Sequence, residues 1–353
     1  MVALLQCVVV CAYSGPSPLP KLNIDPARIS ISGISSGADF AVQFQVAFSK
    51  TIMGSGIFAG QPYHCAVTRF PKDVLVPPDP RVPICEGCPE NKTLIYDHCK
   101  NHVDVVDVSM LRKVATRYER TGLIDGLGNL SRARIYFYRG TQDECYFKGA
   151  VHKTSDFFAH FVPASQLLLN DTVPSGHCWP TDGGGKPCGR GGGAIEDCAY
   201  DGPGDALQHI YGKLSPPAAS VVPASLRLFD QSPFFGADND LTGLNDTGFV
   251  YVPEVCRLGK QCALHLSLHG CAVQTWYDEA VHILSFNRWA ETNGIVILWP
   301  HLKPHGGAHG TVEQKGGCYD AYAQTGSEYD TQRGLQMVAL RRMIETIAGV
   351  HMT

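Results

Sequence analysis

The sequence predicts an α/β protein with a central, mostly parallel sheet flanked by helices, and three observations support this. Short runs rich in β-branched and aromatic residues alternate with longer helical stretches, which is typical of this fold class. No repeat, heptad or long linker divides the 353 residues. A Gly-x-Ser-x-Gly sequence at residues 33–37 stands between a strand-like run and a helix-like stretch, where such a turn belongs in an α/β sheet.

The individual elements follow from hydrophobic periodicity. Residues 28–32 predict a strand that enters the Gly-x-Ser-x-Gly turn, and residues 38–48 predict the helix that leaves it. An amphipathic helix is predicted at residues 331–347. Two Cys-containing segments rich in Pro, charge or Gly are expected to be surface insertions held by disulfides, at residues 77–106 and 182–205. Further strands are predicted at residues 56–59, 134–138, 248–252, 264–268 and 294–298.

Composition excludes several classes of protein. Hydrophobic residues make up 44% of the chain and charged residues 18%, which argues against long disorder. The formal net charge of −4 lacks the basic footprint of a nucleic-acid-binding protein. The Gly-rich segment at residues 183–193 lacks the ending of a phosphate-binding loop. We expect a monomer that needs no cofactor or metal and does not bind membranes or nucleic acid.

The first residues resemble an export signal. The apolar run at residues 1–12 is too short to cross a bilayer and is followed by small residues, as in a signal peptide. No Lys or Arg precedes it, so a buried first strand is the alternative. We predict a signal peptide at residues 1–15 and a single catalytic domain at residues 16–353.

Cysteine and glycosylation patterns also indicate an extracellular protein. Twelve of the 14 cysteines follow residue 11, an even number that allows up to six disulfides in an oxidising compartment. Four Asn-x-Ser/Thr sequons are candidate glycosylation sites. They are at Asn91, Asn129, Asn170 and Asn245. The cysteines are Cys65, Cys85, Cys88, Cys99, Cys145, Cys178, Cys188, Cys198, Cys256, Cys262, Cys271 and Cys318.

The Gly-x-Ser-x-Gly turn predicts a serine nucleophile. A bare hydroxyl needs a base to take its proton, a group that orients the base, and donors for the developing oxyanion. A tight turn between strand and helix lifts the hydroxyl of Ser35 clear of the sheet, and small residues at Gly33 and Gly37 let the turn close. Ser36 is an alternative nucleophile, one residue off the pattern.

An acid and a histidine follow in the order that α/β-hydrolases use. Asp143 comes just after the strand predicted at residues 134–138, and His177 lies in a turn-rich loop. We predict a triad of Ser35, Asp143 and His177, with Glu144 and Asp182 as rivals for the acid. Cys145 and Cys178 lie within two residues of the acid and base, and we hypothesise that disulfides there pin the two loops.

Two backbone N–H groups are candidates for the oxyanion hole. One belongs to Ser36, the residue after the nucleophile. The other belongs to a His-Gly loop, and the best match is Leu-His-Gly-Cys at residues 268–271. That loop normally precedes the nucleophile, whereas here it lies far downstream. A circularly permuted sheet explains this position, the early Ser35 and the strands predicted after His177.

Several motifs together resemble the polyhydroxybutyrate depolymerases. They are Ser-Gly-Ile-Ser-Ser-Gly at residues 32–37 with Ala-Val-Gln-Phe at 41–44, Ala-Gly-Gln-Pro-Tyr at 59–63, Pro-Ser-Gly-His at 174–177 with Pro-Thr-Asp at 180–182, Gly-Phe-Val-Tyr-Val-Pro at 248–253, Leu-His-Gly-Cys at 268–271 and Gly-Cys-Tyr-Asp at 317–320. The resemblance runs from about residue 25 to the C-terminal helix, and it is closest to the single-domain extracellular type with a circularly permuted α/β-hydrolase fold.

This resemblance implies a triad of Ser35, Asp143 and His177, with oxyanion donors at the N–H groups of Ser36 and Cys271. It also implies hydrolysis of an aliphatic polyester, or of its oligomers, through an acyl-enzyme. The family tends to carry several Trp after the Gly-Cys near the C-terminus, where this chain has Tyr319 and Tyr322. These two residues and Trp179 are the candidates for the substrate cleft.

Three alternative functions remain open at this point. One is a feruloyl- or acetyl-type carboxylesterase. Another is a secreted protein that keeps the fold and only binds ligands. The third is a zinc-stabilised binding module around residues 85–102, where Cys85, Cys88, His98, Cys99 and His102 have suitable spacing, although disulfides are favoured in an exported protein.

Overall fold

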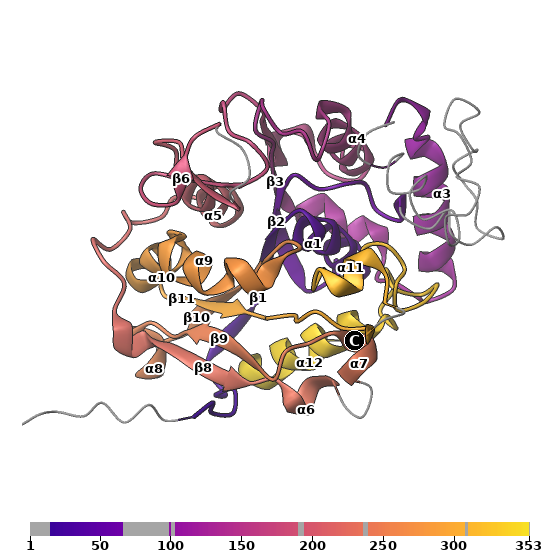
Figure 1. Cartoon of the computed structure of the whole chain (residues 1–353). Helices are drawn as coiled ribbons and strands as arrows, with labels where there is room; N and C mark the ends of the chain where they lie inside the picture. Colours follow the sequence, from indigo (N-terminus) through magenta and orange to yellow (C-terminus); the bar gives the residue numbers. More distant parts are fainter. Residues whose placement is uncertain are drawn as a thin grey trace, which may run out of the picture.

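A computed structural model of the chain describes residues 15–65, 99, 103–189, 194–235, 239–307 and 310–352. Its main sheet has eight strands (Figure 1). They are β1 (Ile24–Ile34), β2 (Ile52–Phe58), β3 (Arg134–Tyr138), β4 (Leu167–Asn170), β8 (Leu226–Asp230), β9 (Thr247–Tyr251), β10 (Cys262–Leu268) and β11 (Ile295–Trp299). A small second sheet contains β5 (Trp179–Thr181), β6 (Lys186–Pro187) and β7 (Ile195–Asp197).

Helices connect and cover these strands. The longer ones are α1 (Ser36–Ala47), α3 (Val108–Arg120), α4 (Lys148–Phe158), α5 (Gly202–Tyr211), α9 (Tyr277–Ile283), α10 (Phe286–Asn293) and α12 (Leu335–Ala348). The short ones are α6 (Ser232–Phe235), α7 (Asn239–Thr242), α8 (Glu254–Arg257) and α11 (Val312–Lys315), with 3-10 turns η4 (Val103–Val105), η5 (Leu127–Arg132), η6 (Ala164–Gln166), η7 (Pro223–Ser225) and η8 (Val273–Thr275). Within the described residues, no helix has both the length and the apolar character needed to span a membrane.

The strand order explains the downstream position of the His-Gly loop. The order across the sheet is β4-β3-β2-β1-β10-β11-β9-β8, so the first four strands of the chain form one half and the last four form the other. All neighbours pair in parallel except at β9, which is antiparallel to both β11 and β8. β10 pairs directly with β1, although more than 200 residues separate the two strands in the sequence. The predicted permuted α/β sheet is therefore confirmed.

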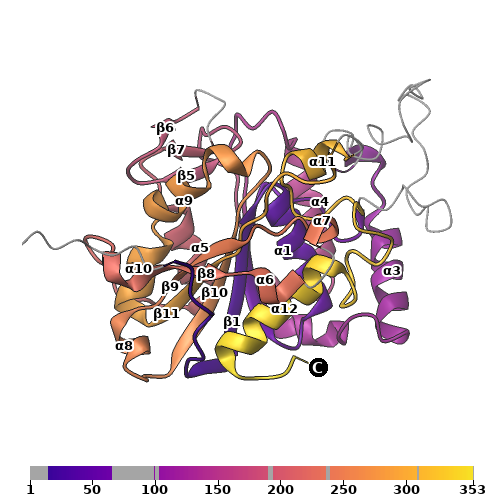
Figure 2. The ribbon, with the colours of Figure 1, turned by 60° about the horizontal axis from the view of Figure 1, so that its bottom comes forward.

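Two hydrophobic layers sandwich the sheet. Alternate side chains of each strand point to opposite faces, as β11 illustrates: Val296 and Leu298 join the core under α1, α3, α4 and α12, whereas Ile295 and Ile297 join the core under α5, α9 and α10. Figure 2 shows these two groups of helices on either side of the strands. Burial on both faces explains why the central strands read as continuous apolar runs.

The predicted elements correspond to observed ones with shifted ends. Strands expected at residues 28–32, 56–59, 134–138, 248–252, 264–268 and 294–298 appear as β1, β2, β3, β9, β10 and β11. The helix expected at 38–48 is α1. The helix expected at 331–347 begins only at Leu335, because the preceding residues form turns capped by the Thr331 hydroxyl on the Glu328 carbonyl. The two edge strands β4 and β8 were not predicted.

The predicted signal peptide and insertions are described only in part. Of residues 1–15, all but Gly15 lie outside the described residues, as does most of residues 77–106. The segment at 182–205 carries β6, β7 and the Cys188–Cys198 disulfide. Three further disulfides join Cys65–Cys99, Cys256–Cys262 and Cys271–Cys318, so Cys99 is not available to the alternative zinc site.

Candidate active site

Ser35 occupies a sharp turn between β1 and α1. Its backbone has φ of 56° and ψ of −125°, an unusual conformation for a residue other than glycine. The neighbouring glycines make this turn possible: a Cβ on Gly33 would lie 2.2 Å from the carbonyl oxygen of Gly37. Ser35 is half-buried, whereas the side chain of the alternative nucleophile, Ser36, is fully buried. The turn thus presents the hydroxyl of Ser35 rather than that of Ser36.

The oxyanion loop (residues 268–272) packs directly against this turn. A Cβ on Gly37 would lie 2.3 Å from the carbonyl oxygen of His269, and a Cβ on Gly270 would lie 3.0 Å from the Cβ of Ser35. The approach at Gly37 leaves no room for a Cβ, and the approach at Gly270 leaves little room for one. The arrangement brings the backbone around Gly270 against the nucleophile, next to the two predicted oxyanion donors, the N–H groups of Ser36 and Cys271.

His269 and a disulfide fix the oxyanion loop. Leu302 N–H donates to Nε2 of His269 over 3.0 Å, so Nδ1 carries the proton and donates to the Gly270 carbonyl over 2.7 Å. Burial and the nearby His301 hold the pKa of His269 well below its usual range, and the ring stays neutral. Cys271 itself is bonded to Cys318. The sequence motif contained His269, but this role was not predicted.

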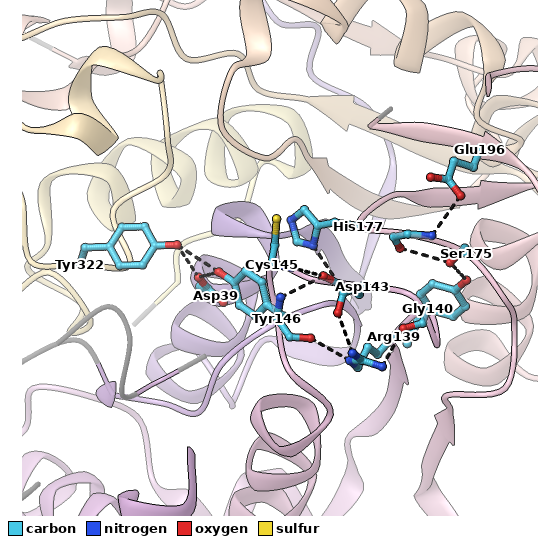
Figure 3. Close-up of polar contacts among 12 residues, drawn as sticks. Asp39, Arg139, Gly140, Asp143, Cys145, Tyr146, Ser175, His177, Glu196 and Tyr322 are labelled. Atoms are coloured by element: carbon cyan, nitrogen blue, oxygen red, sulfur yellow. Dashed lines mark hydrogen bonds and ion pairs between the residues drawn. The ribbon is translucent and has the colours of Figure 1, made fainter. Parts of the chain in front are cut away.

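Asp143 and His177 meet in the structure as the triad requires. Nδ1 of His177 lies 2.9 Å from Oδ2 of Asp143 (Figure 3). The Asp143 side chain is 1% exposed and that of His177 is 21% exposed, so the imidazole is accessible while its carboxylate partner is not. Burial raises the pKa of Asp143, but hydrogen bonds from His177 and from the N–H groups of Tyr146 and Cys145 outweigh it and lower the pKa below the ordinary value.

The rival acids lie elsewhere. Glu144 is exposed, and exposed Asp182 has Arg288 as a neighbour at 3.7 Å. The carboxylate that pairs with His177 is that of Asp143.

Arg139 holds the acid loop (residues 139–146). Arg139 is 8% exposed, and its guanidinium donates to the carbonyl oxygens of Tyr146, Gly140 and Asp143 over 2.7, 2.8 and 2.7 Å. Three fixed donors in one planar group clamp the loop around the carboxylate. Sequence reasoning missed Arg139, because a lone arginine at the end of a strand carries no signal of burial.

Glu196 and Ser175 hold the base loop (residues 173–179). Glu196 is 1% exposed, and its Oε2 accepts the N–H groups of Gly176 and Gly189 over 3.0 and 2.7 Å. The Ser175 carbonyl accepts the N–H of Gln142 over 3.0 Å, which joins the base loop to the acid loop. A Cβ on Gly140 would lie 2.2 Å from that carbonyl oxygen, so glycine is required there. Figure 3 shows Glu196 and Ser175 beside the paired Asp143 and His177.

The cysteines near the triad do not pin these loops in the way we hypothesised. None of the four disulfides described includes Cys145 or Cys178. Cys178 is a buried thiol, and burial together with the charge of Glu196 raises its pKa, which makes it unreactive. The disulfide that does act on the base loop is Cys188–Cys198, which flanks Glu196.

The three cleft candidates are interior side chains. Trp179 is 1% exposed and packs on Phe58 and Phe286. Tyr319 is fully buried and donates to the Pro300 carbonyl, and Tyr322 is 2% exposed. We therefore do not assign Trp179, Tyr319 or Tyr322 to the wall of an open cleft.

Among the residues that the structure describes, two groups of side chains have suitable types and spacing for a metal ion. In the first, ligand atoms of Asp143, Cys145 and His177 lie within 4.8 Å of one another, but the carboxylate and imidazole already bind each other. The second consists of Cys188, Glu196 and Cys198, and its two sulfurs are joined in a disulfide. The arrangement at the first group is that of an acid–base pair.

Comparison with known proteins agrees with this geometry. The chain is 31% identical over 338 residues to the poly(3-hydroxybutyrate) depolymerase of Delftia acidovorans, covering 94% of this chain and 62% of that protein. It is 29% identical over 352 residues to the polyhydroxybutyrate depolymerase of Talaromyces funiculosus, covering 96% of this chain and 94% of that protein. The chain is a homologue of the polyhydroxybutyrate depolymerases. No family model matches it.

Solved structures extend this homology to the fold. The crystal structure of the polyhydroxybutyrate depolymerase from Penicillium funiculosum superposes with a TM-score of 0.79 at 27% identity, over 94% of this chain and 99% of that one. A serine-to-alanine variant of a polyhydroxybutyrate depolymerase, in complex with a trimer of R3HB, superposes equally well. The predicted resemblance and the α/β-hydrolase fold are confirmed. The chain spans less than two thirds of the length of the Delftia relative.

Proposed function

We propose that the chain is an extracellular serine esterase that hydrolyses a polyhydroxybutyrate-like aliphatic polyester, or its oligomers, through an acyl-enzyme. The observation that carries this proposal is the pairing of His177 with Asp143 on loops at the same edge of the sheet as the Ser35 turn. Because β1, β3 and β10 are mutually parallel through the sheet, the loops after them meet at one edge.

The proposed reaction uses these groups in two steps. Ser35 Oγ attacks the ester carbonyl while Nε2 of His177 takes its proton, and Asp143 holds the Nδ1–H and steadies the imidazolium. The N–H groups of Ser36 and Cys271 donate hydrogen bonds to the oxyanion of the tetrahedral intermediate. The imidazolium then protonates the leaving alcohol, leaving an acyl-enzyme on Ser35. His177 then takes a proton from water, which attacks the acyl group; the imidazolium returns that proton to Ser35 Oγ as the hydroxyacid leaves.

The polyester substrate is supported by the names of the relatives and by the bound R3HB trimer in one of the similar structures. No group in the proposed mechanism is a metal or an organic cofactor. We propose a monomeric, single catalytic domain at residues 16–353 behind a signal peptide at residues 1–15.

An extracellular location is supported by the four disulfides among the described residues. Of the glycosylation candidates, Asn129 and Asn170 are half-exposed and Asn91 lies outside the described residues. The amide nitrogen of Asn245 contacts Nδ1 of His301 at 2.9 Å. A glycan on Asn245 would break this contact, so we propose Asn129 and Asn170 as the stronger sites.

The test compares wild type and Ser35→Ala, both with intact disulfides, on a hydroxybutyrate oligomer, a short p-nitrophenyl ester and a feruloyl ester. We expect wild type to cleave the oligomer best and the variant to fall to background. Preference for another ester would keep the mechanism and reject the substrate. Inactivity of folded wild type on all three would reject the enzyme in favour of a binding protein.

A further inference from the structure

One buried side chain contacts parts of the site contributed by three separate segments. Tyr146, which is 1% exposed, lies between β3 and α4 at the end of the acid loop. Its N–H donates to Oδ1 of Asp143 over 2.9 Å. Its ring faces the imidazole of His177, with centroids 5.2 Å apart and planes only 5° from parallel.

The hydroxyl of Tyr146 ends on a buried carboxylate beside the nucleophile. It donates to Oδ2 of Asp39 over 2.6 Å. Asp39 has no exposed surface and lies in the first turn of α1, where its N–H bonds to the carbonyl of Ser35. A series of contacts thus runs from Asp143 and His177 through Tyr146 to Asp39 (Figure 3). The N–H of Asp39 extends it to the backbone of Ser35.

Asp39 is held rigidly enough to serve as an anchor. Its Oδ1 accepts the N–H of Gln61, in the loop after β2, over 2.8 Å. Its Oδ2 accepts the Tyr322 hydroxyl over 2.9 Å as well as that of Tyr146. The N-terminal end of a helix also favours a carboxylate. Donors from three segments and the helix end compensate the burial of this charge.

The direction of the hydrogen bond is fixed by the same surroundings. Burial and the charge of Asp39 raise the pKa of Tyr146 well above its usual range, so the phenol keeps its proton and donates it to Asp39.

We propose that Tyr146 is a positioning residue that orients His177 toward Ser35, and that Asp39 anchors it. The parallel ring restricts rotation of the imidazole about its hydrogen bond to Asp143, which keeps Nε2 directed at the nucleophile. This proposal rests on the proposed triad and assigns a role to two residues outside it.

The test compares three substitutions on a short p-nitrophenyl ester. Tyr146→Phe removes the hydroxyl and keeps the ring, Asp39→Asn removes the charge, and Tyr211→Phe is the control. Tyr211 is a partly buried tyrosine whose hydroxyl lies 2.6 Å from the Ser30 hydroxyl and donates to the Leu264 carbonyl over 3.1 Å. Thermal unfolding establishes that each variant is folded.

We expect Tyr146→Phe to lower kcat on the order of 10- to 100-fold with little change in KM, since a misplaced base affects chemistry more than binding. The acid limb of its pH–rate profile is expected to shift, while Tyr211→Phe behaves as wild type. Tyr146→Phe with Asp39→Asn is expected to lose no more than the larger single effect, because both changes act on the hydrogen bond between Tyr146 and Asp39: the first removes its donor and the second removes the charge of its acceptor.

Two results would overturn the proposal: a kcat in Tyr146→Phe equal to that of Tyr211→Phe, or additive losses in the double variant. If Asp39→Asn does not fold, kcat and the pH profile of Tyr146→Phe against the control decide alone. Failure of the proposed function is distinguishable, because wild type would then be inactive on the ester itself.

Discussion

On one side of Ser35 the oxyanion loop is held by backbone contacts and a covalent bond, whereas on the other side the acid and base loops are held by buried charged groups. Gly37 and Gly270 let the oxyanion loop touch the turn, and the Cys271–Cys318 disulfide fixes its end. Arg139 and Glu196 organise the other two loops through carbonyl and N–H groups. In the proposed mechanism, close backbone approach determines where the oxyanion forms, while side-chain networks set the orientation of the acid and base.

The largest effect is expected at the backbone contact of the oxyanion side. In Gly37→Ala the new Cβ would lie 2.3 Å from the His269 carbonyl oxygen and must push the loop away. Loss of an aligned oxyanion donor lowers kcat on the order of 100- to 1,000-fold. Steady-state kinetics test this against Gly128→Ala, whose Cβ meets nothing within 4 Å. Equal rates in the two variants would contradict the proposed contact.

Disulfide removal distinguishes the covalent part of the oxyanion side from ordinary cross-linking. The Cys271–Cys318 bond spans 47 residues, and its replacement by two alanines is expected to cost about 4 kcal/mol of unfolding free energy. The Cys256–Cys262 bond spans 6 residues and is expected to cost about 2 kcal/mol. Only the first replacement should lower kcat. Urea unfolding and ester kinetics check both. Equal losses of kcat would show that the Cys271–Cys318 disulfide does not position the oxyanion loop for the reaction.

A comparable test on the acid side removes the guanidinium of Arg139. Arg139→Met leaves three buried carbonyl oxygens without their donor and is expected to cost about 3 kcal/mol, with a fall in kcat as the acid loop moves. The control is Arg257→Met, which removes a 51% exposed arginine and is expected to change stability by less than about 1 kcal/mol. An unchanged free energy of unfolding in Arg139→Met would mean that the hydrogen bonds of Arg139 do not stabilise the acid loop.

The smallest expected effect is the pH dependence of the acid side. The pKa of Asp143 is lower in the folded chain than its ordinary value of 3.8, so the folded state binds this proton less readily than the unfolded state. Its stabilisation is present above the unfolded pKa and is lost as pH falls through the folded pKa. Below about pH 4, wild type should therefore lose unfolding free energy more steeply than Asp143→Asn in urea titrations. Parallel curves would contradict this assignment.

The sequence predicted the parts of the site that depend on local pattern. The turn at Ser35 is readable because strand, glycine spacing and helix are contiguous. The permuted order was predictable because the His-Gly loop at residues 268–271 follows Ser35 in the sequence instead of preceding it. The strand β10 that carries it is fully buried, which gives a continuous apolar run.

The parts that sequence reasoning missed depend on contacts between distant segments. Arg139, Glu196 and Asp39 are charged residues in the interior, and charge in a sequence usually indicates surface. The edge strands β4 and β8 are short and only partly buried, so their apolar patterns are weak. Tyr319 and Tyr322 became cleft candidates because the family that the sequence resembles carries Trp residues in that segment, and Trp179 was a further candidate. In the structure all three side chains are buried.

The central claim is that Ser35, and no neighbouring serine, is the nucleophile. The most direct measurement is the mass of the intact protein after reaction with a fluorophosphonate, followed by peptide mapping, for wild type, Ser35→Ala and Ser36→Ala. We predict one adduct on Ser35 in wild type and in Ser36→Ala, and no adduct in folded Ser35→Ala. An adduct that persists in Ser35→Ala, or one that maps to another residue in wild type, would contradict the account.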